Sequence, residues 1–141
     1  MDLTESAGFL DALAAAAGLG KGGAAGSGTQ QGGADTRAVD CGAGVGRITA
    51  GLLMQRFAAV DVVEPVHHFI AQARTDLGRL GHRGEFHQIG LEAFSAGANT
   101  YDCVWVQWVI GHLVDDDMVA FLQVCIPTPP AVPRPCLGLI A

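Results

Sequence analysis

The stretch Asp40-Cys41-Gly42-Ala43-Gly44-Val45-Gly46-Arg47 decides the fold. It follows a short apolar run at 37–41 and opens a helical pattern. Glycines in such a loop let the chain turn tightly and let backbone N–H groups approach a ligand closely. The dinucleotide fingerprint would need a third glycine at position 47, where Arg47 stands. The loop therefore predicts a ligand other than a dinucleotide, with a purely structural turn as the alternative.

Strand-like and helix-like segments alternate on both sides of this loop. Strands are predicted at 37–41, 60–64, 84–89 and 101–108, and helices at 5–17, 46–56, 66–80 and 115–125. This alternation favours an α/β fold with a Rossmann-like but incomplete sheet of about four parallel strands and flanking helices. Ligands of such sheets bind beyond the carboxyl ends of the strands, so the remaining motifs are expected along one edge.

Two further motifs follow the second and third predicted strands. Glu64 ends the second strand, 22 residues after Gly42. An acidic residue at about this spacing accepts hydrogen bonds from ribose hydroxyls. Gly90-Leu91-Glu92 follows the third strand, where a backbone amide near Leu91 and the side chain of Glu92 would suit an adenine. Taken alone, each of these could also be an ordinary strand end or turn.

The fourth predicted strand ends in Trp105-Val106-Gln107-Trp108-Val109-Ile110-Gly111-His112-Leu113. Trp105 alternates with valines and is expected in the core. Gln107 and Trp108 leave the strand end and are candidates to line a substrate channel. His112 is a candidate general base, because an unperturbed imidazole titrates near neutrality; a structural role is the alternative.

The composition limits the classes of partner. The chain has 141 residues, enough for one domain, and a net charge of −6, which argues against nucleic acid as a partner. No apolar run is long enough for a membrane span. The four cysteines form no CxxC pair and no zinc spacing, so reduced thiols and no metal are expected. The N-terminus lacks a basic secretory start, which favours an intracellular protein.

The composition also divides the chain into three parts. Residues 1–35 are expected to form a helix and a glycine-rich linker, residues 36–125 a partial domain, and residues 126–141 a proline-rich tail. The tail holds five of the six prolines. Because proline excludes both helix and central strand, we expect that the tail cannot complete the sheet and that an edge strand is left exposed.

The glycine loop through Thr49, the segment Val60-Asp61-Val62-Val63-Glu64 and the run Trp105–Leu113 together resemble the alpha-N-terminal protein methyltransferases. Enzymes of that family use S-adenosylmethionine to methylate the free α-amino group of proteins that begin X-Pro-Lys. The resemblance covers about residues 37–125. It implies a cytoplasmic or nuclear enzyme whose partners are such proteins, and a chain truncated at both ends relative to the family.

The resemblance also assigns roles to individual residues. It implies that the cofactor is held by Gly42, Gly44, Arg47, Glu64, Leu91, Glu92 and Gln107. Arg47 would bind the cofactor carboxylate, Trp108 would pack on the substrate N-terminus, and His112 would help to deprotonate the amine. Glu92 departs from the glutamine expected at its position. The alternatives are a small-molecule methyltransferase and a non-catalytic fragment that at most binds S-adenosylmethionine.

Overall fold

The computed structural model describes residues 3–16, 35–95, 101–125 and 136–140. The glycine-rich linker and the prolines at 127–135 were singled out in the sequence, and they lie outside the described residues. Among the described helices, none is both long enough and apolar enough to cross a membrane. The described cysteines Cys41, Cys103 and Cys125 are buried, as expected.

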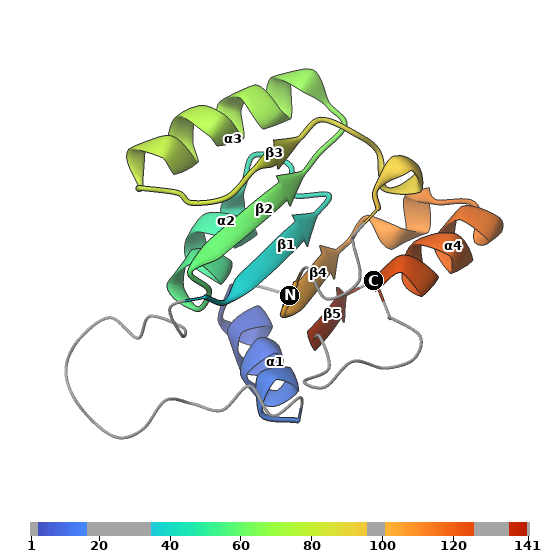
Figure 1. Ribbon diagram of the computed structural model, residues 1–141, viewed down its shortest axis with the longest axis horizontal. Helices are drawn as coiled ribbons and strands as arrows, with labels where there is room; N and C mark the ends of the chain where they lie inside the picture. Colours follow the sequence, from blue (N-terminus) through green and yellow to red (C-terminus); the bar gives the residue numbers. More distant parts are fainter. Residues whose placement is uncertain (1–2, 17–34, 96–100, 126–135, 141) are drawn as a thin grey trace.

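The centre of the molecule is a parallel sheet of five strands in the order β3-β2-β1-β4-β5 (Figure 1). In chain order the strands are β1 (Arg37–Cys41), β2 (Ala59–Val63), β3 (Phe86–His87), β4 (Cys103–Gln107) and β5 (Cys136–Ile140). The predicted α/β alternation and parallel pairing are confirmed. The loops after β1, β2, β3 and β4 consequently emerge along one edge of the sheet.

Helices cover both faces of this sheet because successive strand residues point to opposite sides. One face carries Ala38, Val60, Val62, Cys103 and Trp105. It packs against α1 (Leu3–Ala16), α2 (Arg47–Gly51), the short 3-10 helix η1 (Leu53–Gln55) and α3 (His67–Arg79).

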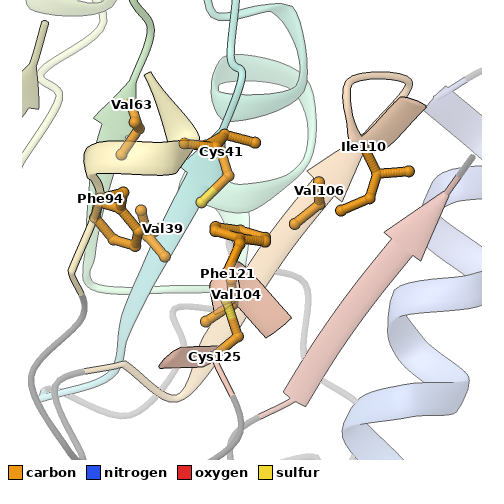
Figure 2. Packing of buried hydrophobic residues seen from close by; sticks show 10 residues of the cluster. Val39, Cys41, Val63, Phe94, Val104, Val106, Ile110, Phe121 and Cys125 are labelled. Carbon is orange, nitrogen blue, oxygen red and sulfur yellow. The ribbon is translucent and has the colours of Figure 1, made fainter. Parts of the chain in front are cut away.

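The opposite face forms the second layer of the core (Figure 2). Its strand residues are Val39, Cys41, Val63, Val104 and Val106. They pack under α4 (Asp115–Cys125) and the 3-10 helices η2 (Leu91–Ala93) and η3 (Ile110–His112). The buried side chains Phe121 and Cys125 come from α4.

The expectation that the tail cannot join the sheet is wrong, and the sheet has one strand more than predicted. β5 pairs with β4 in parallel, from Cys103↔Cys136 to Gln107↔Ile140. The prolines end at Pro135, so the last segment, Cys136-Leu137-Gly138-Leu139-Ile140, keeps every backbone donor that a strand needs. The composition of the tail as a whole concealed this proline-free apolar run, and β4 is not the edge strand.

One close contact shows how β5 fits against its neighbour. Gly138 lies opposite Trp105 in the register of the two strands. A Cβ at position 138 would lie 2.2 Å from Cε3 of Trp105, whose side chain is fully buried. A glycine is therefore required where β5 passes the largest side chain of the core.

Candidate functional site

The glycine loop between β1 and α2 is docked onto the end of β2. The N–H groups of Gly42 and Ala43 both donate to the carbonyl of Val63, at 2.8 and 3.1 Å. Gly42 and Gly44 have φ values of 75° and 57°, in the left-handed region that favours glycine. The sequence pattern thus forms the tight turn that was predicted.

Glu64 closes the same corner from the other side. Its carboxylate accepts hydrogen bonds from the N–H of Gly44 at 2.9 Å and from the N–H of Val66 at 2.8 Å. The residue is only 6% exposed. The structure therefore brings the acid after β2 directly against the loop after β1. Each carboxylate oxygen accepts one backbone bond and retains a lone pair for a further donor such as a hydroxyl.

A second acid, Asp40, is buried beneath the loop. Its Oδ2 accepts a hydrogen bond from Oγ1 of Thr49 in α2, at 2.6 Å. Burial raises the pKa of Asp40 to about 6; the bonds from Thr49 oppose this rise, and the charge of Glu64 adds to it. Sequence reasoning did not single out this pair. The signal was available, because an acid that ends an apolar strand must find a partner when it is buried.

The loop after β4 packs onto the glycine loop through one residue. A Cβ at position 42 would lie 2.4 Å from Cγ1 of Val109. Gly42 is therefore required both by its backbone conformation and by the approach of Val109. Val109 directly follows Trp108, and its carbonyl accepts a hydrogen bond from the N–H of His112, so both predicted substrate-side residues are close in the chain to this contact.

Trp108 has an unusual conformation for an aromatic residue. Its φ is 58°, and it is the only non-glycine residue with a positive φ in the part of the chain that the structure describes. Its side chain is 55% exposed. A bulky residue in this region carries backbone strain, of the kind that clusters at functional sites. The strain and the exposed ring support a role for Trp108 outside the core.

His112 ends η3, one turn beyond Trp108. Its N–H donates to the carbonyl of Val109 at 3.0 Å, and its side chain is exposed. The backbone bond ties the imidazole to the residue that packs on the glycine loop. The structure thus places His112 at the same edge as the loop, in an exposed position.

Gln107, the last residue of β4, is held from the α1 side of the sheet. Its Oε1 accepts a hydrogen bond from Nε1 of Trp105 at 3.2 Å and lies 3.5 Å from Oγ of Ser6 in α1. The expectation that Trp105 belongs to the core is confirmed, because its side chain is fully buried. The contact with Ser6 could not be predicted from the sequence, because the two residues are 101 positions apart. The contact with Trp105 follows from the alternation of β4, which places residues 105 and 107 on the same side of the sheet.

The other three predicted cofactor residues, Leu91, Glu92 and Arg47, differ in which of their groups a ligand could contact. The side chain of Leu91 is buried in the core, so only its backbone can face a ligand. Glu92 is exposed, and its carboxylate folds back over Gly90. Arg47 is the exposed first residue of α2. Arg47 directly follows Gly46 at the end of the glycine loop. Leu91 and Glu92 lie in η2, after β3, and within the described residues no hydrogen bond joins either of them to that loop.

A polar cluster that sequence reasoning missed surrounds Asp61 in β2. Arg37 forms a bidentate ion pair with its carboxylate, with a shortest distance of 2.8 Å, and Tyr101 donates its hydroxyl at 2.6 Å. Burial opposes the charged form, but these bonds and the N–H of Glu85 hold the pKa of Asp61 below its usual value.

Asp61, Glu85 and His87 also bring three possible metal-ligand atoms within 4.8 Å of one another. The guanidinium of Arg37 already neutralises the Asp61 carboxylate and would repel a cation there. The cluster is therefore best described as a structural network that joins β1 to β2.

Comparison with known proteins places this geometry in a family. The sequence model described as AdoMet dependent proline di-methyltransferase matches residues 1–129. This range is wider than residues 37–125, over which the resemblance was noted, and it includes α1. N-terminal Xaa-Pro-Lys N-methyltransferase 1-B of Xenopus laevis is 48% identical over 92 residues, which cover 64% of this chain and 41% of that protein. The corresponding Mus musculus enzyme is 47% identical over 89 residues.

Solved structures agree with the sequence comparison. A Leishmania major SAM-dependent methyltransferase of the DUF858 family superposes with a TM-score of 0.65 at 32% identity, covering 89% of this chain and 46% of that one. A Clostridium acetobutylicum S-adenosylmethionine-dependent methyltransferase shares the fold at 12% identity, with a TM-score of 0.67. The chain spans about two fifths of the length of the curated relatives it matches. The glycine loop, the acid after β2 and these matches together show that the chain belongs to the AdoMet-dependent proline di-methyltransferase family.

Proposed function

We propose that this chain forms the cofactor-binding part of an S-adenosylmethionine-dependent methyltransferase that acts on the α-amino group of proteins beginning X-Pro-Lys. The observation that carries the proposal is the hydrogen bond between Glu64 and the glycine loop at Gly44. It places a nearly buried carboxylate beside a left-handed glycine turn, which suits a nucleoside with two ribose hydroxyls and a charged amino acid end.

Each predicted residue has a role in this proposal. Glu64 binds the ribose, and Gly42 and Gly44 let the backbone approach the methionine end, whose carboxylate pairs with Arg47. The backbone of Leu91 and the side chain of Glu92 read the adenine. Gln107 completes the pocket at the end of β4. The names of the Xenopus and mouse relatives, which specify an Xaa-Pro-Lys N-terminus, support the choice of substrate.

The substrate side is assigned to the loop after β4. When bound, S-adenosylmethionine would supply an electrophilic methyl group: a neutral α-amine would form a bond to the methyl carbon as the C–S bond breaks, and S-adenosylhomocysteine would leave as the thioether. The exposed ring of Trp108 packs on the substrate N-terminus. His112 accepts the amine proton, an easy transfer because an α-amine has a pKa of about 7.7–8.0. Most of the rate enhancement would come from holding the two reactants in line.

We also propose that the protein works in the cytoplasm or nucleus, with protein N-termini and not nucleic acid or membranes as its partners. The buried thiols of Cys41 and Cys125 are compatible with a reducing compartment. The net charge of −6 disfavours phosphate backbones and suits a cationic N-terminus followed by lysine.

Two measurements test the proposal. Isothermal titration with S-adenosylhomocysteine should show binding that Glu64→Ala abolishes and that Arg79→Ala, an exposed change on α3, leaves intact. Incubation with S-adenosylmethionine and an X-Pro-Lys peptide, followed by mass spectrometry, should show methylation that Trp108→Gly and His112→Asn reduce. Failure of a folded chain to bind the nucleoside would refute the proposal.

The peptide assay also separates the alternatives. Binding without transfer to the peptide would identify a fragment that only holds the cofactor. Transfer to small amines with no transfer to the peptide would identify a small-molecule methyltransferase.

A further inference from the structure

Gln107 lies where the sheet meets the ligand edge, and its orientation is set by two residues outside that edge. Trp105 and Gln107 alternate along β4 and therefore point to the same side of the sheet. The indole Nε1 can only donate a hydrogen bond, so the atom of Gln107 that it contacts at 3.2 Å must be the amide oxygen. The indole thus fixes which end of the amide faces the core.

Ser6 acts on the same oxygen from α1. Its side chain is completely buried, and a buried hydroxyl requires a hydrogen-bond partner. Within the described residues, Oε1 of Gln107, at 3.5 Å, is a partner of this hydroxyl. Leu10, one helical turn further along α1, is also fully buried and packs in the cluster that contains Trp105. The helix is therefore anchored over the residues that it helps to orient.

The amide nitrogen of Gln107 is left with two donors. It makes no hydrogen bond to any residue in the ranges that the structure describes. The oxygen is engaged by Trp105 and Ser6, which leaves the nitrogen as the part of the amide available for a ligand at the carboxyl end of β4. At that end Val106 pairs with Cys41, which immediately precedes the glycine loop. The free donors thus lie beside the proposed ligand site.

We propose that Ser6 and Trp105 are positioning residues that hold the Gln107 amide with its N–H donors toward the ligand, where they bind a carboxylate or carbonyl oxygen. The acceptor belongs either to the amino acid end of S-adenosylmethionine or to the peptide backbone of the substrate. This inference rests on the proposed function, but it adds a task for α1: the helix orients a binding residue through Ser6 as well as covering the sheet.

A double-mutant cycle on the full chain tests the inference. Isothermal titration with S-adenosylhomocysteine is compared for the wild type, Ser6→Ala, Gln107→Ala and the double variant. We expect about threefold weaker binding for Ser6→Ala and about tenfold for Gln107→Ala. The double variant should bind no more weakly than Gln107→Ala, because the serine acts through the glutamine. Ser6→Thr, which keeps the hydroxyl, should restore binding.

Nucleoside titration and the KM for the X-Pro-Lys peptide together show which molecule supplies the acceptor oxygen. Weakened nucleoside binding assigns it to the cofactor. Alternatively, nucleoside binding is unchanged while the KM for the X-Pro-Lys peptide rises in the same non-additive way. That pattern assigns the acceptor oxygen to the substrate. Gly8→Ala is the matched control on α1, because a Cβ there meets nothing within 4 Å. It should leave both quantities unchanged.

Hydrogen exchange of the Trp105 indole N–H tests the same inference without a ligand, and it does not depend on a stable serine variant. Gln107→Ala should accelerate hydrogen exchange of the Trp105 indole N–H, with the exposed Trp108 indole as internal reference. Unchanged exchange, or effects of Ser6→Ala and Gln107→Ala that simply add, would overturn the positioning role and leave the proposed function standing. A folded wild type that binds no nucleoside would overturn both.

Discussion

The carboxylate of Glu64 accepts a hydrogen bond from the N–H of Gly44 at 2.9 Å, across the gap between the loops that follow β1 and β2. Its other oxygen accepts from Val66 at 2.8 Å, at the start of α3. One side chain therefore joins the glycine loop, the end of β2 and the following helix before any ligand is bound. In the proposed enzyme this bond pre-forms the corner in which the ribose is held.

Replacing Glu64 by glutamine tests this relationship. An amide retains one acceptor oxygen but presents a donor to either Gly44 or Val66, so one nearly buried N–H loses its partner. We expect a loss of about 1–3 kcal/mol in the free energy of unfolding, measured with urea. S-adenosylhomocysteine affinity should fall as well. Glu85→Gln, a change at an exposed acid, should stay within about 0.5 kcal/mol of the wild type. Wild-type stability and affinity for Glu64→Gln would contradict the role of the carboxylate.

Alanine substitutions at Gly42 and Gly44 separate backbone strain from steric clash. Both residues have positive φ, but only at position 42 would a Cβ meet a neighbour, Cγ1 of Val109 at 2.4 Å. Gly44→Ala should cost about 1–2 kcal/mol from strain alone. Gly42→Ala should cost about 1–3 kcal/mol more, because overpacking adds to the strain. Urea unfolding measures both, and Val109→Ala in the Gly42→Ala background should recover part of the difference. Equal costs at the two positions would show that the loop after β4 does not pack there.

Gly138→Ala tests whether β5 is seated against Trp105. The added Cβ would lie 2.2 Å from a fully buried ring, so either the strand or the indole must move. We expect about 1–3 kcal/mol of destabilisation and a changed near-ultraviolet circular dichroism signal from the tryptophan. Gly111→Ala is the comparison, because a Cβ there meets nothing within 4 Å. If both variants unfold like the wild type, β5 does not pack in this register.

Asp40→Asn should change how stability depends on pH. The pKa of Asp40 in the folded protein, about 6, lies above its ordinary value of 3.8. The folded state therefore binds this proton more tightly, and the stability that Asp40 contributes below about pH 4 is lost as pH rises through 6. Asparagine does not titrate and has no such loss. Between pH 4 and pH 7 the free energy of unfolding of the variant should therefore rise by about 3 kcal/mol relative to that of the wild type.

Urea unfolding at several pH values measures this difference, and Thr49→Val provides the control. The hydrogen bonds from Thr49 lower the pKa of Asp40. Loss of the hydroxyl should therefore move the midpoint of the pH dependence of stability to higher pH. Parallel stability profiles for the wild type and Asp40→Asn would contradict the assignment.

The sequence was sufficient to predict the strands and helices whose formation depends on interactions between neighbouring residues. The alternation of apolar runs and helical spacing predicted β1, β2, β4 and the helices on either side, because strand and helix periods are properties of neighbouring residues. Helix α4 begins and ends at the predicted residues, Asp115 and Cys125. Only two residues of the predicted strand at 84–89 form β3, since boundaries depend on which backbone groups find a partner.

The sequence by itself determined the α/β alternation, the glycine loop and the presence of an acid after β2. Tertiary structure alone decided that the tail forms β5, that Gly138 makes room for Trp105, and that Ser6 reaches Gln107 across 101 positions of the chain. The physical reason is range. Periodicity and turn chemistry act between residues a few positions apart, whereas packing and side-chain hydrogen bonds depend on which distant segments the fold brings into contact.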